Sequence, residues 1–498
     1  MTTVLVSMLA LGAAFAVSSA DLQLQLDGTP IPATRLFPPP EGGSEWSDTV
    51  LMARGQIDGP WEIALKPSGP ATLHPPFAST EQQGILRIRG NGPARFGVEM
   101  PTQRLLVFLD PPEPPPPANA KQLTASAHDA TAALQALLDT APPGGTVLVS
   151  PGRFTIGTIF LRPGVRLHLA RGACLVASLD PGRYPELPNF GGMKYALLVA
   201  REAHGASLTG QGVIDAQGHR LRRMLTTGRH PGTRLLAAID TRGLSLEGIT
   251  LLDAFAWTGH FQNCEDLTVR NVAAVTEINT PGWNGKGAHH TWNNADGLNP
   301  DGCRNLLFED LFLHTGDDAV AVKNMDAKNR VEQVTVRGAV IWTPVAALKV
   351  GTESRGESMR DLTFESIHVA RAGRVLALDI FDTATASNIR FRNITIDRCD
   401  QSLLFRAGKR TAAQTSVGRI QGVSLEGIRF LRDTFPPGQF ETPHTAEPLG
   451  LISVSGWSAG DHSAPTPAAG GLRGLDRAPD LRWEAPEAQR STRPTPEE

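Results

Sequence analysis

The sequence has few cysteines, little excess charge and few long apolar runs, and each shortage excludes a class of protein. The net charge of −3 gives no basic surface, so nucleic acid is not an expected partner. Beyond Ala20 no apolar run is long enough to span a bilayer, so we expect no membrane partner, and we expect a monomer. The cysteines contain no Cys-x-x-Cys pair, so a disulfide framework is not indicated, although one bridge stays open in an exported protein. They are Cys174, Cys264, Cys303 and Cys399.

Residues 1–20 hold an apolar run next to a possible cleavage site. The run from Val4 to Val17 is too short to span a bilayer comfortably, and Ser18-Ser19-Ala20 offers the small residues that signal peptidase requires. No Lys or Arg precedes the run, which leaves an N-terminal strand or helix of the first domain as the alternative. We predict a signal peptide, and therefore a secreted or periplasmic protein.

Composition divides the rest of the chain into domains. Residues 21–110 contain short alternating apolar segments separated by Gly and Pro, a pattern typical of a small β-sandwich. A run of six prolines and one glutamate then predicts a stiff, extended linker over 111–120. The candidate catalytic domain covers 121–456. Residues 457–498 are rich in Pro, Ala, Gly, Arg and Glu without periodicity, so we expect a disordered tail there.

A weak repeat runs through the candidate catalytic domain. Each copy reads apolar-x-apolar-x-corner, where the corner is Gly, Asn or Asp in seven of eight copies. These residue types adopt left-handed backbone angles at little cost, so each copy predicts a short strand, a corner and another strand. Stacked coils of this kind share one core, which predicts an all-β parallel β-helix, with a sandwich of irregular hairpins as the alternative. The copies begin at Ala206, Leu244, Leu267, Leu306, Val334, Leu362, Ile389 and Val423.

A helix is predicted over 129–140, before the first coil. Asp129 can serve as its N-cap. Such a helix would cover the open end of the solenoid, whose first coil otherwise exposes its interior. Its apolar face consists of Ala132, Leu134, Leu137 and Leu138.

Three aspartates stand close together in the middle of the repeat region. The interval from Asp296 to Asp317 is about one coil of a lean β-helix, and Asp318 comes next. Residues one coil apart lie ~4.8 Å apart along the solenoid. Glycosidic bonds are cleaved by two carboxyl groups in different protonation states, and close like charges separate their pKa values. Asp317 and Asp318 can face one cleft only if the backbone bends, which Gly316 permits; two unrelated Asp turns or a cation site are the alternatives.

The loop 279–293 precedes the aspartates and is rich in Gly, Trp and His. Aromatic faces stack on sugar rings, so this loop is a candidate substrate-binding segment. Two adjacent histidines without a third ligand are a poor metal site, and we expect neither a metal nor a cofactor. Trp257 and His260 are further candidates for the same cleft, whereas Trp342 is expected in the core. The candidate side chains of the loop are Trp283, His289, His290 and Trp292.

Several motifs together resemble glycoside hydrolase family 28, the polygalacturonase family, over roughly residues 120–435. They are Asp129-Ala130-Thr131, Gly144-Gly145-Thr146-Val147, Leu167-His168-Leu169, Gly210-Gln211-Gly212-Val213-Ile214-Asp215, Asn294-x-Asp296-Gly297 and Gly316-Asp317-Asp318. The resemblance implies a right-handed parallel β-helix and an inverting hydrolysis of a polysaccharide or oligosaccharide without a metal. It also implies that Asp317 is the general acid, that Asp296 and Asp318 activate water, and that Asn294 orients the site.

The sequence departs from that family where the substrate carboxylate is bound. Ala346-Ala347 stands in place of a His-Gly pair, and Leu376-Ala377-Leu378-Asp379-Ile380 lacks the Arg-x-Lys pair that holds a uronate. Because Asp379 would repel a carboxylate, we do not expect plain polygalacturonate as the substrate; another pectin-related or other plant or microbial polysaccharide is expected. Lys349 and Glu353 are candidates for new substrate contacts.

Two further kinds of function stay open. The sandwich before the solenoid is also similar to glycoside hydrolase family 49, the dextranases and isopullulanases, which use a comparable aspartate trio on neutral glucans. A β-helix polysaccharide lyase or a non-catalytic carbohydrate-binding protein is the alternative from another class.

Overall fold

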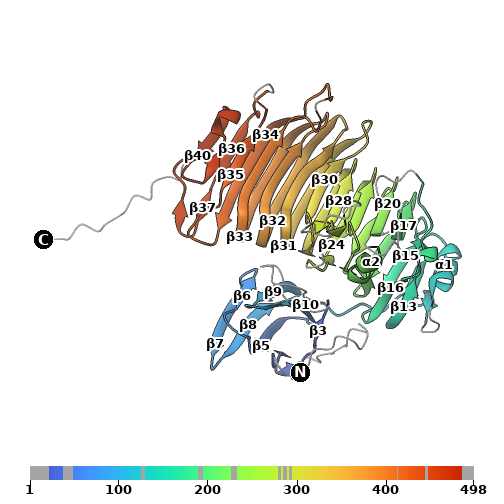
Figure 1. The fold of residues 1–498 in the computed structure, drawn as a ribbon. Helices are drawn as coiled ribbons and strands as arrows, with labels where there is room; N and C mark the ends of the chain where they lie inside the picture. The colour runs from blue at the N-terminus through green and yellow to red at the C-terminus, as the bar shows by residue number, and fades with distance from the viewer. Residues whose placement is uncertain are drawn as a thin grey trace.

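The computed structural model describes residues 22–37, 49–124, 129–188, 195–225, 233–278, 282–283, 289–290, 294–411, 413–443 and 447–484. These residues form an N-terminal pair of sheets and a long solenoid of stacked coils (Figure 1). No helix among the described residues is long and apolar enough to cross a membrane. All four cysteines lie within the described residues and are free thiols.

The N-terminal domain consists of two five-stranded sheets with an apolar core between them, as a β-sandwich requires. One sheet has the order β2-β1-β5-β8-β7, and its strands are β1 (Gln25–Leu26), β2 (Thr29–Pro30), β5 (Pro60–Leu65), β7 (Ala78–Gln82) and β8 (Ile85–Asn91). The other has the order β3-β4-β10-β9-β6, and its strands are β3 (Ala33–Arg35), β4 (Thr49–Gln56), β6 (Thr72–His74), β9 (Ala94–Glu99) and β10 (Gln103–Asp110).

The solenoid is a parallel β-helix, as the repeat predicts, and it is right-handed, as the resemblance implies. Its coils pair in parallel and enclose one continuous apolar core from Leu123 to Ala478. The first coils contain β11 (Lys121–Leu123), α1 (Thr131–Asp139), β12 (Thr146–Val149), β13 (Gly152–Ile156), β14 (Ile159–Phe160), β15 (Arg166–Leu169), β16 (Ala173–Ala177), η1 (Pro181–Arg183), β17 (Ala196–Arg201), β18 (Ser207–Gly210), β19 (Val213–Asp215), α2 (Gly218–Leu225), β20 (Arg234–Ile239), β21 (Ser245–Glu247), β22 (Thr250–Leu252), β23 (Gly259–Gln262), β24 (Glu265–Arg270) and β25 (Ala273–Val275).

The later coils carry the aspartates and then the longest strands. They contain β28 (Leu298–Asp301), β29 (Arg304–His314), β30 (Val320–Asn324), β31 (Arg330–Ser354), β32 (Ser358–Ile380), β33 (Thr385–Ala407), β34 (Arg419–Phe430), β35 (Gly438–Glu441), β36 (Ile452–Ser455), β37 (Ser458–Ala459), β38 (His462–Ser463), β39 (Leu472–Arg473), η2 (Leu475–Arg477) and β40 (Leu481–Glu484). A separate two-stranded pair is formed by β26 (Gly282–Trp283) and β27 (His289–His290).

The corners of the coils have the backbone conformation that the repeat predicts. All eight corner positions have φ between +51° and +106°, and these include Ser366, the one corner that is not Gly, Asn or Asp. Left-handed angles at each corner turn the chain from one sheet of the coil into the next. The corners are Gly210, Gly248, Asn271, Asp310, Gly338, Ser366, Asn393 and Gly427.

The strands β28 and β30 set the alignment of the aspartates. Leu298 pairs with Val320 in this parallel ladder. The same register places Asp318 beside Asp296, and the Gly297 amide donates to the Asp318 carbonyl at 2.9 Å. Asp317 therefore lies one residue before the aligned pair.

The N-terminal end of the solenoid follows the prediction with one difference. The N-cap of α1 is Ala130 without a side-chain cap bond, whereas the Asp129 carboxylate accepts from the Thr131 amide at 2.9 Å and from its hydroxyl at 2.5 Å. Leu134 and Leu138 enter the core of the solenoid. The helix therefore covers the first coil as expected.

The C-terminal end differs from the expected disordered tail. Residues 457–484 continue the solenoid with short strands, and Trp457, which is 2% exposed, packs against Phe430 and Trp483 with ring centroids at 5.3 and 6.2 Å. Strands of two residues are too short to show an apolar period, so the composition of this stretch led to a wrong prediction of disorder. Residues 485–498, the rest of the expected tail, lie outside the described residues.

The N-terminal domain packs on the side of the solenoid through a shared apolar cluster (Figure 1). In β10, Leu105 and Val107 enter the sandwich core, whereas Leu106 and Phe108 enter the cluster between the domains. Phe108 meets Phe312 of β29 with ring centroids at 5.0 Å. Both faces of β10 are therefore buried, each in a different core.

The proline-rich segment lies against the solenoid instead of spanning open solvent. The Glu113 carboxylate accepts from the backbone amides of Arg171 and Gln211 at 2.8 and 3.2 Å. The Gln211 side chain in turn donates to the Pro111 carbonyl at 2.7 Å. These contacts fix the segment to the early coils.

Candidate active site

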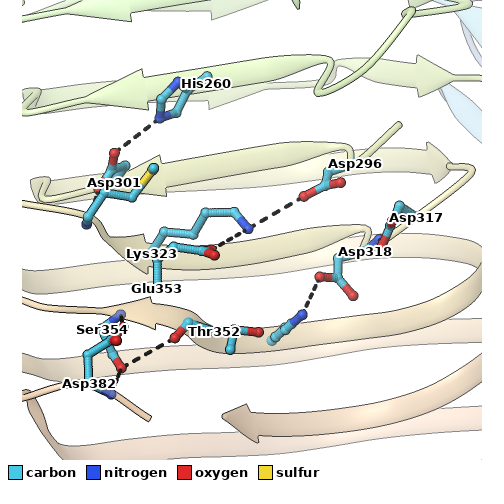
Figure 2. Close-up of polar contacts among 12 residues, drawn as sticks. His260, Asp296, Asp301, Asp317, Asp318, Lys323, Thr352, Glu353, Ser354 and Asp382 are labelled. Carbon is cyan, nitrogen blue, oxygen red and sulfur yellow. Dashed lines mark hydrogen bonds and ion pairs between the residues drawn. The ribbon is translucent and has the colours of Figure 1, made fainter. Parts of the chain in front are cut away.

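The three aspartates gather at one edge of a sheet of the solenoid (Figure 2). Asp296 precedes β28, and Asp317 and Asp318 form the connection between β29 and β30. Asp296 and Asp318 are 2% and 3% exposed, whereas Asp317 is half-buried. Asp317 is thus the carboxyl of the three that a bound molecule reaches most readily.

A bend of the backbone brings Asp317 and Asp318 to the same side. The chain bends at Gly316 and Asp317, and the Gly316 amide donates to the Ala295 carbonyl at 3.2 Å. The Asp317 carbonyl accepts from the hydroxyls of Thr315 and Thr343 at 2.7 and 2.6 Å, and the Asp318 amide donates to the Asp317 carboxylate at 2.7 Å. Sequence reasoning missed both threonines, because their function depends on which strands are adjacent.

Two donors from the next coil contact the side chain of Asp318. The Lys349 ammonium donates to Oδ2 at 2.7 Å, and the Ala346 amide donates to Oδ1 at 3.2 Å. The predicted candidate Lys349 therefore contacts an aspartate of the trio directly. The backbone at Ala346, where the family pattern has a His-Gly pair, also supports that aspartate.

Asp296 lies beside a buried lysine that sequence reasoning missed. Lys323 Nζ is 3.7 Å from the Asp296 carboxylate and 3.2 Å from that of Glu353 (Figure 2). The same ammonium stands over the Trp257 ring, 4.4 Å from its centroid. A lysine within the fully buried strand β30 was the available signal, because such a charge needs a partner. The predicted candidate Glu353 thus contacts Lys323, which in turn lies beside Asp296.

The protonation of the trio is set by burial and by neighbouring charges. Burial, followed by the charge of Asp318, raises the pKa of Asp317 to about 6. Burial, followed by the charge of Asp317, also raises the pKa of Asp296, against the opposing charge of Lys323. Burial would raise the pKa of Glu353 as well, but the charge and hydrogen bond of Lys323 lower it to about 2. In a mildly acidic medium Asp317 is therefore protonated while Glu353 is ionised.

Asp379 lies one coil beyond Gly351 and is 1% exposed. Its carboxylate accepts from Arg406 Nε at 2.7 Å and lies 3.8 Å from Arg374 Nη1. The expected repulsion of a substrate carboxylate by Asp379 needs correction, because two guanidinium groups balance its charge.

The other predicted candidates separate into three groups. Asn294 is exposed with a φ of +53°. His260 is fully buried and contacts Asp301 at 3.2 Å, and burial lowers its pKa to about 4, so this side chain is a neutral part of the interior. Trp292 and the side chains of the remaining loop candidates, Trp283, His289 and His290, lie outside the described residues.

Comparison with known proteins shows similarity to one family of glycoside hydrolases and to its members. The model for "Glycosyl hydrolases family 28" matches residues 192–432, which include all three aspartates. A probable polygalacturonase from Vitis vinifera is 26% identical over 244 residues, which are 45% of this chain and 47% of that relative. The chain spans between 47% and 63% of the length of this and two further curated relatives.

Two solved structures show the same fold at low identity. A polygalacturonase from Erwinia carotovora ssp. carotovora superposes with a TM-score of 0.54 at 16% identity, over 75% of this chain and 96% of its own. Dex49A from Penicillium minioluteum superposes with a TM-score of 0.60 at 12% identity, over 93% of both chains. The comparisons therefore confirm the predicted resemblance to glycoside hydrolase family 28 and the predicted fold.

Proposed function

We propose that this protein is an inverting O-glycoside hydrolase of polygalacturonase type that cleaves a polysaccharide with Asp296, Asp317 and Asp318. The observation that supports it best is the difference among the three carboxyls. Asp317 is half-buried with a raised pKa, whereas Asp318 is paired with Lys349. One site therefore offers a proton donor beside a carboxyl group that contacts a cation, and glycoside hydrolysis uses a pair of carboxyl groups in this way.

In this mechanism Asp317 protonates the glycosidic oxygen as the bond from that oxygen to the anomeric carbon breaks. Water attacks the anomeric carbon from the opposite face, and its proton passes to the pair Asp296 and Asp318. The product has an inverted anomeric hydroxyl, and proton exchange with solvent restores the starting state. Lys323 and Lys349 limit the repulsion among the carboxylates during this exchange.

For the substrate, we propose a polysaccharide with fewer carboxylates than polygalacturonate. Asp379 engages Arg406 and lies near Arg374, so a uronate would compete with an existing ion pair for these cations. A pectin-related polymer with neutral sugars or blocked carboxyls fits this arrangement better.

A neutral glucan is the second candidate substrate. The superposition with Dex49A covers 93% of this chain, which is more than the solenoid alone can supply, so it extends into the N-terminal sheets. That likeness concerns the fold, and it keeps a dextranase or isopullulanase type of reaction as the alternative.

Export remains a prediction from residues 1–20, which lie outside the described residues. N-terminal sequencing of protein recovered from the periplasm or the medium would begin at Asp21 if the signal peptide is removed as predicted.

The decisive experiment incubates the purified protein with polygalacturonate, rhamnogalacturonan, dextran and pullulan, and identifies the products. We expect new reducing ends, inverted at the anomeric carbon, and no absorbance from an unsaturated sugar. A chromophore at the new non-reducing end would instead identify a lyase, and sugar binding without cleavage would identify a carbohydrate-binding protein.

The Asp317→Asn variant tests the acid directly. Loss of general acid catalysis lowers rates by about 10²–10⁴-fold, so we expect kcat on the cleaved polymer to fall within that range while the polymer still binds. Because Asn is nearly isosteric, the circular dichroism spectrum serves as the folding control. A variant with more than a tenth of the wild-type kcat would refute the assignment of Asp317.

A further inference from the structure

The N-terminal domain meets the solenoid directly behind the bend that carries Asp317. His314 is the last residue of β29, and Trp342 is its partner in β31. Each is followed by one of the threonines whose hydroxyls hold the Asp317 carbonyl, and the Thr315 amide donates to the Trp342 carbonyl at 3.0 Å. A displacement of either side chain is therefore transmitted to the bend within one residue.

Both side chains are covered by the N-terminal domain. Arg104 of β10 places its guanidinium 2.7 Å from His314 Nε2 and 5.6 Å from the centroid of the Trp342 ring. His74 of β6 packs edge-on against Trp342, with ring centroids at 5.2 Å. At Gly97 of β9 an added β-carbon would lie 2.5 Å from the same indole.

The protonation state of His314 follows from its two neighbours. Nδ1 lies 3.0 Å from the Thr276 carbonyl, which can only accept, so Nδ1 carries the proton. Nε2 is then the acceptor for Arg104, and the ring is neutral. Burial and the charge of Arg104 lower the pKa of His314 to about 3, in agreement with that assignment.

A second contact fixes the same sheet of the N-terminal domain to later coils. The Glu99 carboxylate lies 3.2 Å from His74 Nε2 and forms an ion pair with Arg398 of β33. His74 Nδ1 is 3.2 Å from His368 Nε2. The sheet therefore contacts four successive coils, at His314, Trp342, His368 and Arg398, and Arg104 has little freedom to move.

We propose that the N-terminal domain is part of the catalytic apparatus, because Arg104 acts through His314 and Trp342 to position the threonines that fix the carbonyl of Asp317. Arg104 is thus a positioning residue for the proposed acid, and this inference rests on the proposed function. Asp317 lies in a bend outside the strand ladders, so these hydroxyls replace the support that a neighbouring strand would give. A misplacement of ~1 Å at a reacting group lowers rates by about 100-fold.

The test compares Arg104→Met with Arg54→Met in the full-length protein. Arg54 of β4 is a matched control, because it is also buried in the same sheet and donates to the solenoid, at the Gln211 carbonyl at 2.8 Å. We expect Arg104→Met to lower kcat on the cleaved polymer by about 10-fold or more with an unchanged KM. We expect Arg54→Met to lower the Tm while kcat stays within about 2-fold of wild type.

A second pair of variants tests the hydrogen bond from the Thr343 hydroxyl to the Asp317 carbonyl. Thr343→Val removes the hydroxyl and should lower kcat as Arg104→Met does, whereas Thr343→Ser should keep it. If Arg104 and Thr343 act on Asp317 through the same series of contacts, kcat of the double variant Arg104→Met/Thr343→Val falls by less than the product of the two single losses. If Arg104→Met does not fold, Arg104→Lys and Gly97→Ala probe the same contacts, and a lowered kcat at constant KM is again the expected result.

Wild-type kcat in folded Arg104 variants, an equal loss in Arg54→Met, or fully multiplicative losses in the double variant would overturn the inference. These outcomes are distinct from failure of the proposed function. An active Asp317→Asn variant removes the proposed acid, whereas an inactive Asp317→Asn beside a fully active Arg104→Met removes the positioning inference alone.

Discussion

At the scale of single residues, the site depends on charges that compensate one another across coils. The trio carries three carboxyls in a small buried volume, and the ammonium groups of Lys323 and Lys349 come from two successive coils. The motif Gly316-Asp317-Asp318 was readable from the sequence, because its residues are consecutive. Lys323 was not, because its contact with Asp296 depends on how the coils stack.

The raised pKa of Asp317 predicts the alkaline side of the pH–rate profile. The acid must be protonated to act, so kcat/KM should fall as the pH rises through about 6. The measurement is kcat/KM between pH 4 and pH 9 on the polymer that the wild type cleaves fastest. A profile that stays flat up to pH 8 would contradict the assignment, provided that chemistry limits the rate.

The same shift predicts a pH-dependent gain in stability for Asp317→Asn. The pKa of Asp317 is raised on folding, so its contribution to stability is present at low pH and is lost as the pH rises through about 6. Asn cannot ionise and avoids this loss. We expect the Tm of the variant to exceed that of wild type at pH 7.5 and the difference to shrink at pH 4, as measured by calorimetry.

At the scale of elements, the coils follow from the backbone preferences of single corner residues. Gly, Asn and Asp at the corners predicted the solenoid correctly, because left-handed angles are a preference of the residue itself. The interface between the domains has a weaker local signature. The apolar run from Leu105 to Leu109 was the available signal, since a sandwich strand with one face in water would alternate.

Asn393 is an exposed corner at which the preference for left-handed backbone angles can be tested. It is exposed and has a φ of +51°. Asn393→Ala should destabilise the protein by about 1 kcal/mol, because a β-carbon without a polar group disfavours left-handed angles. Asn393→Gly is the matched control and should leave stability unchanged within about 0.5 kcal/mol, because glycine adopts these angles freely. Thermal unfolding measures both, and equal midpoints for the two variants would contradict this preference.

At the scale of the whole molecule, the two domains share one folded unit. Phe108 is fully buried between them, and removal of a buried Phe side chain costs about 3–5 kcal/mol. We expect Phe108→Ala to lower the Tm of the whole protein and wild type to unfold in one calorimetric transition. Two separate transitions in wild type, with only one displaced in the variant, would show independent domains.

The contact between His74 and His368 has a consequence for the order of events during synthesis. These residues are 294 positions apart, so the outer face of the N-terminal sheet receives the last of its cover only after most of the chain has left the ribosome. Leu106 and Phe108 belong to a cluster whose members in the solenoid reach from Cys174 to Ala370, so their cover stays incomplete for a time on a nascent domain that already has its own core. Transiently exposed apolar surface of this kind promotes aggregation, so the yield of native protein depends on how quickly the coils are completed, and chaperones that shield the early domain should increase it.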